Sequence, residues 1–413
     1  MDVLVLGNGF DLAHKLPTTY LSFLKATEYI ANQHSFQNLT IGQVFEAIKN
    51  ECDVIQKSYA AYKSVYDNHV LAKDVVLKIK VLCDKNEWWQ YFKKTYNKSV
   101  GWIDFEKEIA SVIKRINYFI DTNEPYSTFP MRNETGLIAL HFEFFVEPIE
   151  EYSASVDYHS CMVHQCSYRF NTEYLTTSSE SKGITVNRRK IAEDLFKALL
   201  DFSQILRLYF ELFVESTIEA LKAANMIQLN KEYVKFIDIV TYNYTNAFEA
   251  IYNKEEVAHI HGSLDRDIIL GINPDNNDEI DGDLSFISFK KYYQRVVFGT
   301  DLDYLHILTD MKNLVKHEQT VALSIIGHSL DVTDKDSLGE LFEASNDIKI
   351  YYHKKEKIPE YVQKLVRFFG KTKFDELRYD RHLRFLPLNE LKGPSPEMIN
   401  HDRFFRVKQS IKK

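Results

Sequence analysis

The sequence lacks the features of secreted, membrane-spanning and repeat proteins. Four cysteines in 413 residues are too few for a disulfide framework, and they fit a protein of the reducing cytoplasm. No apolar run approaches the length that spans a bilayer, so we expect no contact with a membrane. The first residues already have the character of a core strand, and we therefore expect no signal peptide. Internal repeats and low-complexity segments are also missing.

An excess of positive charge is missing as well. Lys and Arg number 51 against 59 Asp and Glu, and the net charge of −8 at pH 7 argues against a nucleic-acid-binding surface over the whole molecule. Residues 378–413 are locally basic, and we expect a solvated helix end and tail there rather than a nucleic-acid contact. With 45% hydrophobic and 27% charged residues, the composition is that of an ordinary soluble protein.

Two of the four cysteines lie near histidines. Cys161 and Cys166 follow His159 and His164 closely, but this spacing is not a usual zinc pattern and the stretch has no second pair of ligands. We therefore expect no metal ion.

The N-terminal segment carries the first functional signal. An apolar strand over 2–6 ends directly in GNGFD at 7–11. Two glycines one residue apart let the backbone turn tightly and approach a ligand, and a following helix would point its N-terminal amides at an anion. We therefore expect a phosphate-binding turn at the carboxyl end of a sheet strand.

The other strands of this sheet come late in the chain. Several of the predicted segments are continuous and β-branched, as in parallel strands that are buried on both faces. The sequence therefore predicts an α/β, Rossmann-like fold with a mostly parallel open sheet. The predicted strands are Val234–Val240, Val257–Ile260, Ile268–Leu270, Val321–Ile326 and Ile348–Tyr352.

Between the first and second strands the pattern is mainly helical. Apolar residues recur at helical spacing over 41–64, 105–121 and 188–224, whereas 152–187 is predicted to be an irregular connection with a mobile loop at 178–183. We expect a large helical insertion that caps a small-molecule site. The predicted division has three parts: a Rossmann-like nucleotide-binding core at 1–30 and 231–370, a helical cap at 31–230 and a C-terminal extension at 371–413. We expect the core to end in a helix over 356–370, and GPSP at 393–396 to break the C-terminal extension.

Four polar turns follow predicted strands. Because loops after adjacent parallel strands meet at one edge of a sheet, we expect these turns to form one site. Their backbone amides, asparagines, histidines and carboxylates suit a phosphorylated ligand with a sugar. The turns are GNGFD at 7–11, TYNYTN at 241–246, HIHGS at 259–263 and GHSLDVTD at 327–334.

Each polar residue of these turns also has a structural interpretation. Asp11 would either cap the first helix or meet a ligand hydroxyl or base edge, and Asn243 would either form a turn or bind ligand. His261 follows a strand directly and would be either a structural histidine or a general base. Asp331 and Asp334 would either cap the next helix or line the site near His328. Asp104 is expected to cap the 105–121 helix, with Glu106 in its first turn.

The motifs GNGFDLAHKLPTTY, WIDFE, VTYNYTN, HIHG and IIGHSLDVTDKD, in this order, resemble the AbiH family of bacterial phage abortive-infection proteins. The resemblance spans nearly the whole chain and ends with IKIYYH. It implies a cytoplasmic antiphage protein. One departure is Lys15, where the family usually has glycine before Leu-Pro.

The same turns are more distantly similar to sirtuin-like NAD-binding folds, which carry GAG-x-S, TQN, HG and G-T/Y-S motifs in this order. The similarity implies that NAD is substrate or ligand, that Asn243 orients water or the nicotinamide ribose, and that His261 is a general base. We expect Asp11 to be the third catalytic residue. Thr18-Thr19-Tyr20 replaces the Asp-Phe-Arg of that pattern, and the four-cysteine zinc ribbon is missing, so protein deacetylation is not expected. The residues expected to bind the nucleotide are Gly7, Asn8, Gly9, Phe10, Thr241, Gly262, Gly327, His328, Ser329 and Asp334.

Three functions stay open at this point. The first is hydrolysis of NAD at the nicotinamide–ribose bond, with Asp11 or Asp334 stabilising the positive charge. The second is a nuclease acting on RNA or DNA, and the third is a non-catalytic nucleotide sensor that engages a phage-derived trigger or a host protein. The sequence leaves open whether the chain forms a homo-oligomer.

Overall fold

The structure is a computed structural model. It describes residues 1–34, 38–96, 104–122, 129–130, 146–149, 167–177, 184–218, 220–221, 229, 234–235, 237–273, 284–380 and 382–388. Within these ranges the protein is mixed α/β, with a mostly parallel six-stranded sheet and many helices.

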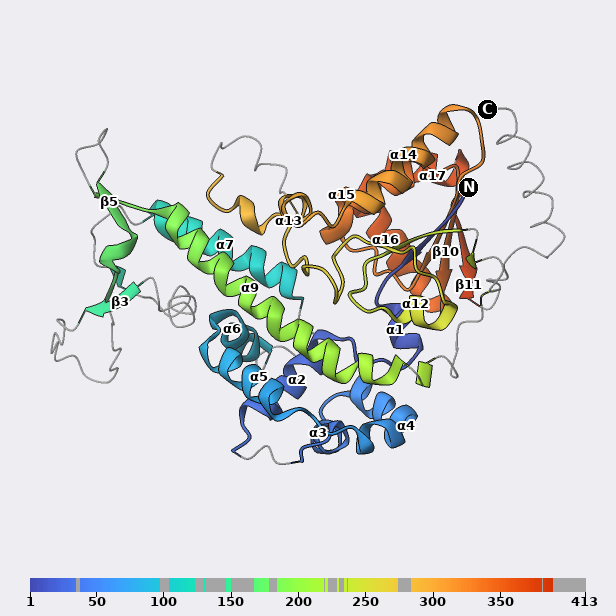
Figure 1. Ribbon diagram of the computed structural model, residues 1–413. Coiled ribbons are helices and arrows are strands. Elements are labelled where there is room, and N and C mark those ends of the chain that lie inside the picture. The colour runs from blue at the N-terminus through green and yellow to red at the C-terminus, as the bar shows by residue number, and fades with distance from the viewer. Residues whose placement is uncertain are drawn as a thin grey trace, which may run out of the picture. The chain divides into compact units, whose positions relative to one another are not determined.

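The sheet has the order β11-β10-β9-β1-β7-β8. Its neighbouring strands all pair in parallel, which confirms the predicted type of sheet. Strand β1, blue in Figure 1, therefore lies between strands that come more than two hundred residues later. The strands are β1 (Asp2–Leu6), β7 (Asp238–Thr241), β8 (Ala258–His259), β9 (Ala322–Ile326), β10 (Asp347–Tyr352) and β11 (Arg384–Pro387).

Both faces of the central strands are buried. Val3 and Val5 of β1 pack into one apolar core, whereas Leu4 and Leu6 are buried on the opposite face, as in parallel sheets that are covered on both sides. Four helices supply the apolar residues that join Val3 and Val5 in their core. These helices are α14 (Leu302–Lys316), α15 (Lys335–Glu343), α16 (Ile358–Phe369) and α17 (Lys371–Tyr379), which carry warm colours in Figure 1.

Two strand predictions are wrong, one in part and one entirely. The segment predicted to be a strand over 234–240 becomes one only at Asp238. The segment over 268–270 is not a strand at all. There the side-chain amide of Gln294 replaces a neighbouring strand, because it donates to the Leu270 carbonyl and accepts from the Leu270 N–H. Strand β11 was not predicted.

The described helices that come before β7 range from 5 to 26 residues in length. The pattern over 41–64 folds as two helices, and the one predicted over 188–224 ends at Phe213. The 356–370 helix is confirmed, with bounds at Ile358 and Phe369. The further helices are α1 (Gly9–Ala13), α2 (Tyr20–Ala31), α3 (Ile41–Ile48), α4 (Asp53–Asn68), α5 (Lys73–Lys85), α6 (Glu87–Tyr96), α7 (Phe105–Thr122), α9 (Arg188–Phe213), α12 (Ala247–Tyr252) and α13 (Lys291–Phe298).

The inserted region contains strands as well as helices. The prediction of an irregular connection over 152–187 is wrong for three segments, which form β4 (Ser167–Phe170), β5 (Leu175–Thr177) and β6 (Ile184–Val186). Strand β4 pairs with β2 (Phe129–Pro130) and β3 (Val146–Ile149), and β5 pairs with β6, all antiparallel. The loop predicted at 178–183 and the chain break predicted at 393–396 lie outside the described residues.

The chain divides into two compact units. The described residues of Met1–Val76, Leu206–Ile269 and Arg295–Lys413 form the first unit, and those of Leu77–Ile205 and Leu270–Gln294 form the second. The first unit contains the whole six-stranded sheet. The predicted partition into core, cap and extension stays a prediction. Among the described residues, no helix is long and apolar enough to cross a membrane.

Lys15, which stands where the family pattern has glycine, adopts a left-handed conformation with φ of +64°. This conformation costs an L-residue about 1–2 kcal/mol, whereas glycine costs roughly 0.5–1 kcal/mol in chain entropy. We expect Lys15→Gly to raise the free energy of unfolding by about 0.5 kcal/mol, as measured by urea denaturation. The control Lys57→Gly, at an exposed position within α4, should lower it by about 1 kcal/mol. A Lys15→Gly variant as unstable as the control would contradict this account.

Candidate active site

The site begins where the turns after β1 and β9 touch. The Gly7 N–H donates to the Ile326 carbonyl at 3.0 Å, and the Gly9 N–H donates to the Gly327 carbonyl at 2.8 Å. A Cβ at Gly7 would lie 2.5 Å from the Cα of His328, so glycine is required there by close backbone packing. The Phe10 N–H donates to the Gly7 carbonyl. These three amides are therefore engaged within the protein, contrary to the free phosphate-binding amides that the sequence predicts.

Asp11 lies within α1 and is 1% exposed. Its Oδ1 accepts from the Asn243 side-chain amide at 3.0 Å, and its Oδ2 accepts from the Thr245 hydroxyl at 2.7 Å. Burial raises the pKa of the Asp11 carboxyl to about 7, and the negative charge of Glu249 adds to this rise. The prediction that Asp11 caps the first helix is wrong, since its side chain joins the turns after β1 and β7.

Asn243 is held at three points. Its main-chain N–H donates to the Thr241 hydroxyl at 3.1 Å, its side-chain Nδ2 donates to Asp11, and its main-chain carbonyl lies 3.0 Å from Nδ1 of His259. The residue is 7% exposed, and its side-chain Oδ1 is buried without a hydrogen-bond partner. A buried amide oxygen without a donor is costly. A water or a ligand hydroxyl could donate to this oxygen.

His261 belongs to a second polar group, around Asp334. His261 Nε2 lies 3.1 Å from Asp334 Oδ1, and His328 Nε2 lies 3.4 Å from Asp334 Oδ2. The Leu330 N–H donates to Nδ1 of His328 at 2.9 Å, which places the proton of the neutral His328 ring on Nε2, toward the carboxylate. The ring of Tyr242 packs against both histidines, with centroid distances of 5.0 and 4.4 Å.

The remaining predicted ligand residues have mixed surroundings. Asn8 is exposed and bonds Thr18 through both its amide atoms. Phe10 is fully buried against Phe248. Gly262 has a φ of +77°, and a Cβ there would lie 1.8 Å from the Asp267 carbonyl oxygen. These observations explain the residue types structurally, and a role for them in binding stays a prediction.

Further predictions concern helix caps and the end of β9. Asp331 accepts from the Thr333 N–H, and Asp104 accepts from two N–H groups at the start of α7, so both are caps. Ser329 is exposed at the end of the β9 turn. Trp102 lies outside the described residues.

His259 was not singled out in the sequence, although it is as deeply buried as Asn243. Its Nε2 lies 2.5 Å from Oε1 of Glu249 in α12. Burial alone would lower the pKa of His259, but the hydrogen bond and charge of Glu249, with the Asn243 carbonyl, outweigh it and raise this pKa. The motif HIHGS could have indicated His259, since this residue ends strand β8. No sequence motif indicated Glu249.

The four predicted turns therefore converge in the first unit. Asp11 meets Asn243, the glycines at 7 and 9 meet Gly327, and His261 meets Asp334. Within the described ranges, no three His, Cys, Asp or Glu side chains are arranged to hold a metal ion. Cys161 and Cys166, with His159 and His164, lie outside those ranges.

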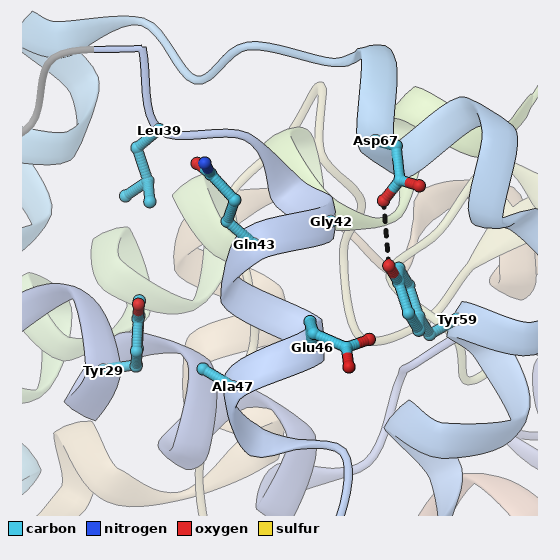
Figure 2. A pocket seen from close by; sticks show the side chains of 8 residues that line it. All are labelled: Tyr29, Leu39, Gly42, Gln43, Glu46, Ala47, Tyr59 and Asp67. Carbon is cyan, nitrogen blue, oxygen red and sulfur yellow. Dashed lines mark hydrogen bonds between the residues drawn. The ribbon is translucent and has the colours of Figure 1, made fainter.

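An open depression on the same unit lies elsewhere. It is formed by α2, α3 and α4 and is lined by Gly42, Gln43, Glu46, Tyr59 and their neighbours (Figure 2). The Tyr59 hydroxyl donates to Asp67 at its rim. None of the predicted site residues lines it. The buried polar groups Asp11, Asn243, His261 and Asp334 lie at the convergent turns and not in this depression.

Comparison with known proteins gives one result. No curated protein and no solved structure matches the chain. The family described as "Bacteriophage abortive infection AbiH" matches residues 3–353, a stretch that contains all four turns and the strands from β1 to β10. The chain thus belongs to the AbiH family, which indicates a function in abortive infection by bacteriophage.

Proposed function

We propose that this AbiH protein binds NAD at the carboxyl edge of its parallel sheet and hydrolyses the nicotinamide–ribose bond, and that loss of NAD underlies abortive infection. The observation that carries the proposal is the unpartnered Oδ1 of buried Asn243, beside Asp11. An acceptor of this kind suits the donor that the reaction needs, a water or a ribose hydroxyl.

The topology supports a nucleotide site at this edge. Numbered along the chain, the six strands run 3-2-1-4-5-6 across the sheet. This is the order of Rossmann-type folds, which bind nucleotides where the order reverses, at the carboxyl ends of the first and fourth strands. Here these strands are β1 and β9, whose turns carry Gly7 and Gly327. We infer a Rossmann-like, sirtuin-like core on this basis.

The chemistry also fits the groups present. Hydrolysis breaks the bond between C1′ of the ribose and the nicotinamide nitrogen, the electron pair leaves with neutral nicotinamide, and water adds to C1′ with loss of a proton. The carbon is positively charged in between, so a carboxylate in a water-poor site favours the reaction. Asp11 has a pKa of about 7, so part of it is ionised at neutral pH. In this proposal His261, whose Nε2 lies 3.1 Å from Asp334 Oδ1, is the general base.

The proposal is tested by incubating the purified protein with NAD, ATP and RNA and resolving the products by chromatography. We expect nicotinamide and ADP-ribose from NAD. Asn243→Ala and His261→Ala should each lower the rate by about 100-fold. Asn68→Ala and His306→Ala, at exposed positions in α4 and α14, serve as matched controls and should leave the rate unchanged.

The same four variants are then expressed in cells, where NAD content and growth are measured. We expect NAD to fall with the wild type and the controls only. Cleavage of RNA or ATP with NAD intact would instead indicate a nuclease or another nucleotide hydrolase. Folded Asn243→Ala and His261→Ala proteins that consume NAD as fast as the wild type would refute the assigned roles.

A further inference from the structure

Two residues without a role in the predicted site, His259 and Glu249, lie next to Asn243. His259 Nδ1 lies 3.0 Å from the Asn243 main-chain carbonyl, and its Nε2 lies 2.5 Å from Glu249 Oε1. The side chain of His259 is 8% exposed and that of Glu249 20%. The second carboxyl oxygen of Glu249 is buried without a partner. The hydrogen bond between His259 and the main-chain carbonyl of Asn243 connects this pair to the site.

The two contacts of His259 define its protonation. A carbonyl oxygen only accepts, so Nδ1 carries a proton, and the carboxylate of Glu249 requires a second proton at Nε2. The ring is then an imidazolium that is paired with a carboxylate inside the protein. The charged groups that act on it are Glu249, which favours the imidazolium, and Arg266, which opposes it.

The pair also acts on Asp11, because the charges of Glu249 and His259 both affect the pKa of this carboxyl. Glu249 raises the pKa of Asp11 and His259 lowers it. Asn243 is thus held on one side by Asp11, through its side-chain amide, and on the other by His259, through its main-chain carbonyl. Loss of the His259 contact would remove one of the three contacts that fix the position of Asn243.

We propose that His259 and Glu249 are positioning residues, which hold the Asn243 carbonyl so that its unpartnered Oδ1 stays available to the reacting water or ribose hydroxyl. The role of His259 and Glu249 in turnover rests on the proposed function, whereas their effect on the position of the Asn243 carbonyl does not. Neither residue touches the substrate. Their loss should therefore lower kcat and leave KM for NAD nearly unchanged.

The hold on Asn243 is tested without any substrate. Protein labelled with ¹³C at the Asn carbonyl and ¹⁵N in Tyr gives NMR correlations only from Asn-Tyr pairs. The sequence has two, Asn243-Tyr244 and Asn117-Tyr118, and the second is an internal reference. In Glu249→Gln and His259→Gln we expect the Asn243 carbonyl signal to shift and the Asn117 signal to stay. The control Glu255→Gln, at an exposed position, should shift neither.

The kinetic arm uses the same variants. We expect kcat for NAD to fall by about 100-fold in Glu249→Gln and His259→Gln, because a misplaced reacting group costs about this factor. The pH profile adds a signature that a merely structural role would not give. The part of the pH profile that depends on the ionisation of Asp11 should move to lower pH in Glu249→Gln and to higher pH in His259→Gln. The reason is that Glu249 raises the pKa of Asp11 and His259 lowers it.

The outcomes separate the two proposals. A shifted Asn243 signal without NAD turnover in the wild type supports the hold on Asn243 and overturns the proposed function. An unshifted signal in both variants overturns the positioning pair, whatever the activity. A shifted signal with unchanged kcat shows that the position of Asn243 does not matter for turnover, and overturns the role of the pair in the reaction.

Discussion

Replacement of Gly327 by alanine is expected to lower the free energy of unfolding by about 2–5 kcal/mol. Two costs add at this position. The φ of Gly327 is +67°, where an L-residue loses about 1–2 kcal/mol. A Cβ would also lie 2.4 Å from the Phe10 nitrogen, which is backbone and has no rotamer to give way, and overpacking costs about 1–3 kcal/mol.

Two other glycines separate these costs. Gly299 has nearly the same φ, +63°, but an added Cβ there meets nothing within 4 Å, so Gly299→Ala should show the conformational cost alone. Gly339 lies within helix α15, and a Cβ there only touches Phe368 at 3.8 Å. Gly339→Ala should therefore stabilise the protein by about 0.5–1 kcal/mol. Urea denaturation of the three variants measures the differences. Equal losses in Gly327→Ala and Gly299→Ala would refute the close contact between the turns.

Asp11→Asn is expected to stabilise the protein by up to about 4 kcal/mol above pH 7, although it removes a residue from the candidate site. The carboxyl titrates at about 7 in the folded protein, against a reference value of 3.8. Between these values the folded state binds the proton and the unfolded state does not. The free energy of unfolding therefore falls by about 1.4 kcal/mol per pH unit as the pH rises from 4 to 7, and is lowest above pH 7. Asparagine stays neutral and avoids this loss.

The measurement is the difference in unfolding free energy between Asp11→Asn and the wild type at pH 5, 6, 7 and 8. The difference should grow up to pH 7 and then level off. Asp347→Asn is a control of opposite sign. Despite the opposing effect of burial, Lys349 and Arg384 lower the pKa of Asp347, so its ionised form stabilises the fold above the unfolded pKa. Parallel curves for Asp11→Asn and the wild type would show that Asp11 does not titrate near neutrality.

The sequence predicted the position of the candidate site better than its internal contacts. Strand ends followed by glycine or asparagine located all four turns, because parallel strands bring their carboxyl ends to one edge. It also predicted the parallel sheet and the helices α3, α4, α7, α9 and α16, whose apolar spacing is local, but it missed α5, α6, α13 and α14. Glu249 could not be found in this way. Its partner, His259, is ten positions away on another element, and only the packing of α12 beside β8 brings the two together.

The errors have physical causes of the same kind. The apolar run at 268–270 has the composition of a strand, but Gln294 satisfies its backbone, and no local pattern reveals this. The glycines at 7 and 9 were expected to face a phosphate. They instead allow two turns to pack backbone against backbone, a requirement that becomes visible only when β9 lies beside β1. Small antiparallel strands in the inserted region were missed because each is at most four residues long.

The central place of β1 has a consequence for synthesis on the ribosome. This strand emerges before the other strands of its sheet, more than two hundred residues ahead of both of its neighbours, β7 and β9. At about 5–20 residues per second, roughly 15–65 s pass between the emergence of Asp11 and that of Asp334. Throughout that interval the apolar N-terminal segment lacks its partners, and a nascent or prematurely terminated chain holds only part of the polar constellation. A chain that is interrupted before Asp334 lacks the carboxylate that lies beside His261 and His328.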